Sequence, residues 1–183
     1  MSLPPTDCLA TPAAMPCDCA PASLQLDCRA FRDALGSYAT GVTVVTALDL
    51  DGRPIGLTVN SFAAVSLQPP LVLWSLGNGS NSLEAFRTAS HYCINVLAAD
   101  QEDLSNRFAT WPTDRFVGLR WSPGCGGAPV LEGCCAHFEV RNDIRHPGGD
   151  HLIFVGQVQR FSQHPTAKPL LFHRGRYRAL ADT

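Results

Sequence analysis

Short runs of apolar and β-branched residues, separated by turn residues, occupy most of the chain. The run Val42–Leu48 predicts a strand, and Asp49–Gly52 (DLDG) predicts a turn that returns the chain along Arg53–Ser61 as a hairpin. Similar runs predict further extended segments over Leu71–Leu76, His91–Leu97, Val130–Ile144, His151–Phe161 and Pro169–Leu180. Between two of them, Trp111–Pro129 is rich in loop-forming residues. The pattern is typical of a β-rich protein.

Helical spacing is found in a few short segments only. Asp27 predicts the N-cap of a helix over Cys28–Ala39. The apolar residues Phe31, Leu35 and Tyr38 recur on one face of this helix, and we expect that face to pack in the core.

Two more short helices are predicted between strands. Asn81 followed by Glu84 resembles a capping box and places a helix near Leu83–Thr88. Asp100 predicts the cap of a helix over Asp100–Ala109. Because strands outnumber these scattered helices, we predict a mainly β protein with short helices (α+β), built as an antiparallel barrel rather than from βαβ units.

Composition indicates one folded domain. Of 183 residues, 45% are hydrophobic and only 16% are charged, so we expect part of the apolar surface to be hidden in an oligomer interface. Residues 1–26 are rich in proline, alanine and cysteine and predict a flexible tail before a domain over residues 27–183. With a net charge of −2 and no basic stripe, no nucleic-acid partner is expected. No apolar run reaches the roughly 18 residues of a membrane span, so no membrane partner is expected either.

The eight cysteines do not form a recognisable framework. Zinc sites usually combine C-x-x-C pairs, whereas Cys17 and Cys19 are separated by one residue and have no partner motif. We therefore nominate no metal ligand and expect reduced thiols. The N-terminus has no basic start and no apolar segment of a secretory signal, so we expect a cytoplasmic protein.

The segment Thr58–Ser66 (TVNSFAAVS) has three hydroxyls and a carboxamide among small and apolar residues. Neutral hydrogen-bonding groups beside apolar side chains suit a flat ring system with polar edges better than a metal or a polyanion. The same residues also suit an ordinary strand end with a Thr/Ser/Asn turn.

Two other short motifs have chemical potential. Ser80 and Ser82 lie where a helix is expected to begin, so they suit either an anion seat or ordinary capping. Gly149-Asp150-His151 begins a strand with an imidazole beside a carboxylate, or forms a plain hairpin turn. Gly124–Gly127 is no dinucleotide fingerprint, because Pro129 follows and no helical pattern opens there.

The order of these motifs identifies a family. The set comprises Gly41–Thr46, Gly56–Ser66, Pro69–Leu73, Ser80–Phe86, Asn95–Leu97, Phe108, Phe116–Gly118, Gly149–His151, Gly156 with Val158, and Pro169–Tyr177. It resembles the flavin reductase-like family, whose members are small NAD(P)H:flavin oxidoreductases with an FMN-binding split β-barrel. Many of these serve as the reductase component of two-component flavin monooxygenases. The resemblance covers about residues 28–180.

The resemblance implies roles for individual residues. The isoalloxazine and ribityl part of the flavin would be lined, largely through backbone groups, by Thr58, Asn60, Ser61 and Phe62, with Ser66 facing the same site. Ser80 and Ser82 would hold the flavin phosphate. Gly149, Asp150 and the candidate catalytic residue His151 would lie at the nicotinamide side, and Phe172 and Tyr177 would belong to the strand that closes the site.

The resemblance also implies the cofactors and partners. FMN or FAD would accept a hydride from NADH or NADPH, so the protein would need to stack two rings rather than supply a nucleophile. A homodimer and a separate oxygenase component are the implied partners. The motifs leave open a tightly bound FMN enzyme acting on another substrate and a non-catalytic flavin- or haem-binding module.

Two departures from the family pattern affect the flavin site. Ala64 stands where relatives often have Ser, and Gly77–Ser82 contains no Arg or Lys for a phosphate. The charge would then come from elsewhere, with Arg87, Lys168 and Arg174 as the candidates. FMN versus FAD and NADH versus NADPH stay open at the level of sequence.

Overall fold

The computed structural model describes residues 27–110 and 114–181, so the expected tail over residues 1–26 lies outside the described residues. The helices there are α1 (Cys28–Leu35), α2 (Leu83–Thr88), α3 (Glu102–Ala109) and the 3₁₀ turn η1 (Cys125–Gly127). The strands are β1 (Thr40–Gly41), β2 (Thr43–Leu48), β3 (Pro54–Val59), β4 (Ala63–Leu67), β5 (Pro70–Gly77), β6 (His91–Val96), β7 (Trp121–Pro123), β8 (Pro129–Leu131), β9 (Ala136–Gly148), β10 (His151–Gln163), β11 (Leu171–His173) and β12 (Arg176–Arg178).

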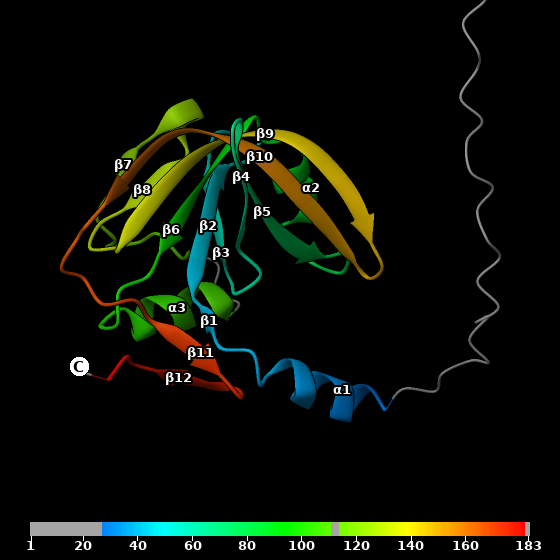
Figure 1. Cartoon of the computed structure of the whole chain (residues 1–183). Helices are drawn as coiled ribbons and strands as arrows, with labels where there is room; N and C mark the ends of the chain where they lie inside the picture. The colour runs from blue at the N-terminus through cyan, green and yellow to red at the C-terminus, as the bar shows by residue number, and fades with distance from the viewer. Residues whose placement is uncertain (1–26, 111–113, 182–183) are drawn as a thin grey trace, which may run out of the picture.

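A seven-stranded sheet in the order β3-β2-β6-β9-β10-β5-β4 is the centre of the described structure. The sheet is strongly curled (Figure 1). Its two edge strands, β3 and β4, follow each other in sequence. A three-stranded sheet β1-β11-β12 and the pair β7-β8 flank it, and the strand pairs are antiparallel. The prediction of a mainly β, antiparallel barrel with short helices is confirmed. No helix within the described ranges is long and apolar enough to cross a membrane.

The predicted first hairpin is also confirmed. Strands β2 and β3 pair from Thr43 opposite Val59 to Leu48 opposite Pro54. The carboxylate of Asp49 accepts hydrogen bonds from the backbone N–H groups of Asp51 (2.9 Å) and Arg53 (2.8 Å), which fixes the turn between the strands.

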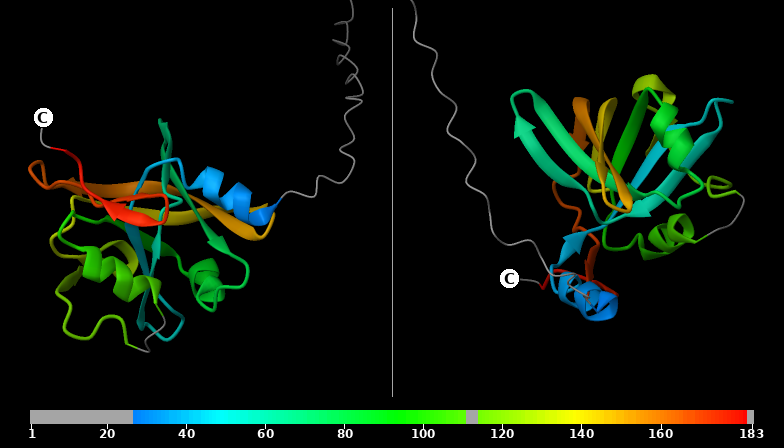
Figure 2. Two further views of the ribbon diagram at one scale, coloured as in Figure 1. Left: turned by 90° about the horizontal axis from the view of Figure 1, so that it is seen from below. Right: turned by 90° about the vertical axis from the view of Figure 1, so that its right-hand side faces the viewer.

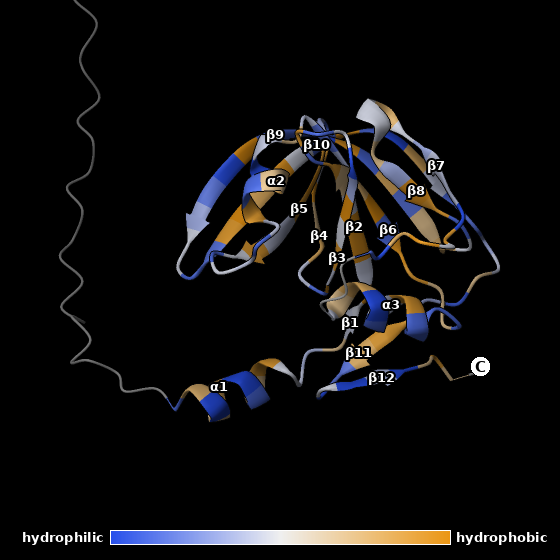
Figure 3. Cartoon of the chain, turned by 180° about the vertical axis from the view of Figure 1, so that it is seen from behind, coloured by the Kyte–Doolittle hydropathy of each residue, from blue (hydrophilic) through white to orange (hydrophobic). Residues whose placement is uncertain are grey.

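The strands of the curled sheet are rich in apolar residues, which Figure 3 colours orange, and many of these residues are buried in the core. Trp74 on β5 lies directly opposite Phe154 on β10, and their rings stack with centroids 4.5 Å apart. Phe86 of α2 and Tyr92 of β6 approach the same indole edge-on. A second cluster includes Leu97, Phe108 and Leu131 and lies under α3.

Gly156 marks the tightest point of the main sheet. The register between β9 and β10 shifts between Val155 and Gln157, on either side of this glycine. A Cβ atom on Gly156 would lie 2.5 Å from the Arg141 carbonyl oxygen, from the Tyr92 hydroxyl and from a methyl of Val140. The three strands therefore approach one another closely only because residue 156 has no side chain.

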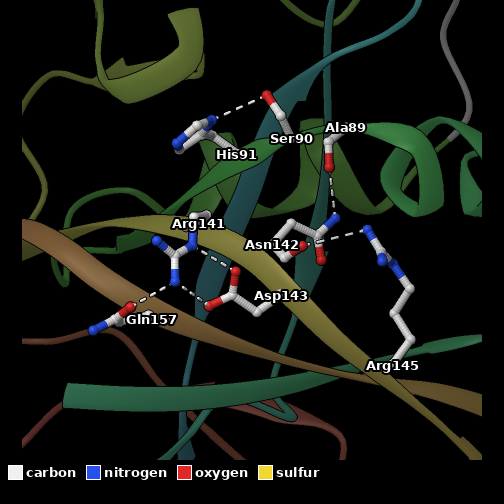
Figure 4. A network of polar contacts seen from close by, with 8 residues as sticks. All are labelled: Ala89, Ser90, His91, Arg141, Asn142, Asp143, Arg145 and Gln157. Carbon is white, nitrogen blue, oxygen red and sulfur yellow. Dashed lines mark hydrogen bonds and ion pairs between the residues drawn. The ribbon is translucent and has the colours of Figure 1, made fainter. Parts of the chain in front are cut away.

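A polar network fastens this irregular part of the sheet to α2 (Figure 4). Arg141 donates to both carboxylate oxygens of Asp143, at 2.6 and 3.0 Å, and to the amide oxygen of Gln157 at 2.8 Å. These hydrogen bonds hold the pKa of Asp143 below its usual range. The buried carboxamide of Asn142 donates to the carbonyl oxygens of Phe86 and Ala89, both at 2.8 Å, and so holds the end of α2 against β9.

The first helix differs from its prediction. Asp27 caps it as expected, accepting from the N–H groups of residues 29 and 30, but α1 ends at Leu35 with Gly36 as C-cap instead of continuing to Ala39. The expected core face is wrong for the single chain, because Phe31, Leu35 and Tyr38 are 51%, 59% and 79% exposed. Helix α1 lies outside the curled sheet (Figures 1 and 2), and residues 27–110 and 114–181 leave that face exposed.

Three further expectations need correction. The N-cap of α2 is Ser82 and that of α3 is Gln101, and neither side chain makes a capping bond, so the roles predicted for Asn81 and Asp100 are wrong. The predicted strand Val130–Ile144 is two strands, β8 and β9, because Gly133 turns the chain with φ near +80°. The loop-rich stretch before it contains the short strand β7.

We predict that Gly156→Ala destabilises the protein by about 1–3 kcal/mol, because the new methyl group overlaps a backbone oxygen, a hydroxyl and a valine methyl. Urea unfolding followed by fluorescence measures the change. Gly41→Ala is the matched control, since a Cβ atom on Gly41 meets nothing within 4 Å. Equal stabilities of the two variants would contradict the tight approach at Gly156.

Candidate active site

A cavity of about 200 Å³ opens where β3, α3 and the β11–β12 hairpin meet. It is lined by Val42, Thr58, Val59, Asn60, Ser105, Ala109, Phe172 and Tyr177. Four residues that the sequence nominated from two distant motifs thus share one cavity. Phe172 and Tyr177, whose ring centroids are 5.4 Å apart, line this cavity together with Thr58, Val59 and Asn60.

Ser105 joins the walls of this cavity. The Thr58 hydroxyl donates to the Ser105 carbonyl oxygen at 2.7 Å. The Ser105 hydroxyl is 2.9 Å from the Tyr177 hydroxyl, which also donates to the Asn106 side chain at 3.0 Å. Ser105 itself is fully buried, and these bonds tie β3 and β12 to α3.

Three other nominated residues of the segment Thr58–Ser66 do not line the cavity, namely Ser61, Phe62 and Ser66. The Ser61 hydroxyl exchanges two 3.0 Å hydrogen bonds with the backbone of Ser75 on β5. The ring of Phe62 packs against Phe138 with centroids 5.5 Å apart. Ser66 lies on β4, where its hydroxyl accepts from the N–H of Gln68. The side chains of all three residues are therefore engaged in contacts within the fold.

The remaining nominated residues form a second group beside Gly77, the last residue of β5. His151 pairs with Gly77 in the sheet, and the N–H of Asn78 donates to the Asp150 carbonyl oxygen at 2.8 Å. Ser80 and Ser82 follow within the same turn, where the N–H of Ser82 donates to the Ser80 hydroxyl. The structure thus brings Ser80 and Ser82 to the β9–β10 hairpin that carries Gly149, Asp150 and His151.

His151 is oriented by its neighbour in sequence. Its Nδ1 lies 2.7 Å from a carboxylate oxygen of Asp150, and both side chains are exposed. The hydrogen bond from His151 lowers the pKa of Asp150 below its usual range, so this carboxyl group is ionised at neutral pH. The other ring nitrogen lies over Gly77, where an added Cβ atom would meet it at 3.8 Å. That nitrogen is left for a bound molecule.

Strand β5 connects the two groups. It holds Ser61 through Ser75 at one point and pairs with His151 through Gly77 two residues later. The segment Thr58–Ser61 thus connects the cavity to β5, and β5 pairs at its end with the strand that follows the β9–β10 hairpin turn.

Comparison with known proteins decides the family. Residues 35–181 match the flavin reductase like domain. The chain belongs to this family. The sequence-based expectation of a flavin oxidoreductase is thereby confirmed, together with the split-barrel fold.

Family members of several kinds resemble the chain closely. "FMN reductase (NADH) SmoA" of Agrobacterium fabrum is 50% identical over 149 residues, which cover 81% of this chain and 84% of that protein. "Flavin-dependent monooxygenase, reductase subunit HsaB" of Mycobacterium tuberculosis is 42% identical over 157 residues, with 85% and 83% covered. The structure of "NADH:FAD oxidoreductase SgcE6 in complex with NAD and FAD fragments" of Streptomyces globisporus has a TM-score of 0.81 at 37% identity, with 85% and 93% covered.

The cavity fits the ring system of a flavin, the group that gives the family its name. Val42, Phe172 and the body of Tyr177 supply apolar and aromatic walls, and Thr58 and Asn60 add neutral polar groups at the edge. Of the residues placed by the structure, none that lines this cavity is charged. Such a lining suits a flat, uncharged ring with polar edges.

One residue of the site was missed from the sequence. Ser105 lies between Leu104 and Asn106 in a short helix, and a single serine there has no local signal of function. Its importance comes from contacts with residues 47 positions before it and 72 positions after it. The alternative charge donor Arg87 is exposed and pairs with Glu84 at 3.3 Å. Arg174 lines a separate groove that shares Asn60 and Phe172 with the cavity.

We predict that Thr58→Val lowers the free energy of unfolding by about 1 kcal/mol, because the Ser105 carbonyl oxygen loses a hydrogen bond. Flavin binding should weaken as well, since β3 and α3 lose their tie beside the cavity. Urea unfolding and fluorescence titration with flavin measure the two effects.

Thr110→Val is the matched control for this substitution. The Thr110 hydroxyl bonds to the Asn106 carbonyl oxygen on the same helix and is exposed, so stability should change by less than about 0.5 kcal/mol. Identical flavin affinity of Thr58→Val and the parent protein would show that this tie does not shape the site.

Proposed function

We propose that the protein reduces a diffusible flavin with NADH and delivers the reduced flavin to a separate oxygenase. The observation that carries the proposal is the neutral, aromatic cavity at Thr58, Asn60, Phe172 and Tyr177, connected through β5 to the Asp150–His151 pair. The relatives named as reductase subunits or components of monooxygenases support the role of the oxygenase.

The chain itself contributes binding and orientation. When bound, the flavin supplies an electron-accepting ring for the hydride of the nicotinamide. The aromatic wall formed by Phe172 and Tyr177 excludes water, and Thr58 and Asn60 supply neutral polar groups at the edge of the cavity. Holding two rings in contact converts an encounter in solution into a step within one complex, which is a large part of the rate gain in such reactions.

His151 and Asp150 act at the nicotinamide side in this proposal. The ionised carboxylate of Asp150 accepts a hydrogen bond from Nδ1–H and fixes the ring over Gly77. The opposite nitrogen is then free to contact the nicotinamide nucleotide. Because the hairpin is exposed, substrates and products can enter and leave from solution, which suits a flavin used as a substrate rather than a resident cofactor.

The proposal is tested by measuring NADH and NADPH oxidation by dialysed protein with added FMN, FAD or riboflavin. Activity that depends on added flavin is expected, with NADH the better donor. A protein that retains stoichiometric flavin through dialysis and oxidises no nucleotide when flavin is added would contradict the proposal. That result would favour a tightly bound flavoprotein or a carrier module.

We predict that His151→Ala slows flavin reduction roughly 10- to 100-fold in stopped-flow measurements, while the flavin dissociation constant changes little. The same substitution should return the pKa of Asp150 toward its usual value, measured by carboxyl NMR, because the hydrogen bond from His151 lowers it.

His146→Ala is the control, since His146 is exposed on the same hairpin and pairs with Ile153. Its rate should equal that of the parent protein. An unchanged reduction rate in His151→Ala would remove His151 from the mechanism.

We also propose that the protein is a homodimer in which a second copy covers the edge strand β4. This strand ends the seven-stranded sheet and has no charged residue. Val65 and Leu67 are exposed on it, Leu67 to 95%. An uncharged apolar edge strand can pair with strands of other chains and cause aggregation unless it is covered. A second copy of the same chain can cover it in a symmetric dimer.

We predict that Leu67→Lys shifts the protein toward the monomer in light scattering coupled to size exclusion, because the ammonium group cannot be buried at an apolar contact. Leu50→Lys is the matched control, since Leu50 is 82% exposed at the tip of the β2–β3 hairpin. A parent protein that is monomeric at all concentrations would refute the proposed dimer.

A further inference from the structure

A larger groove adjoins the cavity. It measures about 940 Å³ and is lined by residues of α1 and of the β11–β12 turn. The lining includes Arg32, Asp33, Tyr38, Asn60, Phe172 and Arg174. Asn60 and Phe172 line both spaces, so a molecule in the cavity can extend directly into the groove.

The two sides of the groove are tied together by the backbone. The N–H of Arg174 donates to the Gly36 carbonyl oxygen at 2.8 Å. Arg174 has a φ of +49°, in the left-handed region that residues other than glycine rarely occupy. Such a conformation costs of order 1–3 kcal/mol and is concentrated at functional sites. Here it places an arginine at the junction of α1 and the C-terminal hairpin.

Positive charge gathers at this end of the molecule. Five of the fourteen basic residues belong to α1 and the C-terminal hairpin, although the whole chain has a net charge of −2. They are Arg29, Arg32, Arg174, Arg176 and Arg178. Asp33 is the acidic residue that lines the groove. Within the described parts of the chain, no carboxylate lies within ion-pair distance of Arg32 or Arg174.

We propose that this groove binds the ADP half of a dinucleotide substrate, with Arg32 and Arg174 on the phosphates. The inference rests on the proposed function and extends it. Guanidinium groups are well suited to phosphate oxygens, and the exposed aromatic ring of Tyr38 offers a face for the adenine. The volume is within the roughly 300–1,000 Å³ of small-molecule sites. FAD and NADH both carry an ADP half, whereas FMN and nicotinamide mononucleotide do not.

Kinetics of charge-removing variants tests the proposal. Arg32→Gln and Arg174→Gln are compared with Arg29→Gln and Arg176→Gln, which remove a neighbouring charge without touching the groove lining. Glutamine and arginine bear the same backbone strain at residue 174, so the substitution leaves that strain unchanged. KM is measured for FAD and FMN, and for NADH and reduced nicotinamide mononucleotide.

We expect the groove variants to raise KM for a dinucleotide about 10-fold and to leave KM of the matching mononucleotide unchanged. A rise for FAD and not for FMN assigns the groove to FAD. A rise for NADH and not for its mononucleotide assigns it to the nicotinamide nucleotide. Equal changes for dinucleotides and mononucleotides, equal changes in the control variants, or no change would each overturn the proposal.

Binding of ADP to the flavin-free parent protein gives a second test that does not depend on activity or on any variant. Calorimetry should detect ADP binding, with affinity falling about 10-fold in Arg32→Gln and staying constant in Arg29→Gln. Absence of ADP binding overturns the groove assignment. Loss of the dimer in Arg32→Gln would also overturn it, because it would show that a second copy fills the groove. If the parent protein reduces no flavin but binds ADP, the proposed function fails and the groove assignment stands.

Discussion

The antiparallel pairing of β10 with β5 is the constraint on which the rest of the structure depends. It stacks Trp74 on Phe154 in the core and, a few residues further along the same strands, places His151 opposite Gly77. The sheet can curl enough to bring these elements together because Gly156 lets β6, β9 and β10 approach without a side chain between them. Core packing and the position of the candidate active site therefore come from the same pair of strands.

Short-range sequence patterns predicted most strands and turns correctly. They did not predict which parts of the molecule pack against a given apolar face. The DLDG turn sets the β2–β3 register by itself, because the Asp49 carboxylate bonds within four residues of its own position. The periodicity of Phe31, Leu35 and Tyr38 correctly indicated an amphipathic helix but contained no information on its partner. Among the residues that the structure describes, strands close the core and that apolar face stays exposed.

The candidate site shows the same division. Thr58, Asn60, Phe172 and Tyr177 were found because they belong to recognisable motifs, and the fold places them around one cavity. Ser105 was not found, because its contacts reach residues far away in sequence and its neighbours in α3 give no hint of them. Ser61 and Phe62 show the converse. They were expected to line the flavin, but their side chains are engaged in long-range contacts with Ser75 and Phe138. Residue identity alone cannot tell a ligand contact from such a structural one.

The pairing of β1 with β11 has a consequence for how the cavity forms. Thr40 and Gly41 pair with Phe172 and Leu171, which lie far along the chain from them, so this contact has a high entropic cost of loop closure. Phe172 and Tyr177 are two walls of the cavity, so the cavity stays open on that side until this long-range pairing has formed.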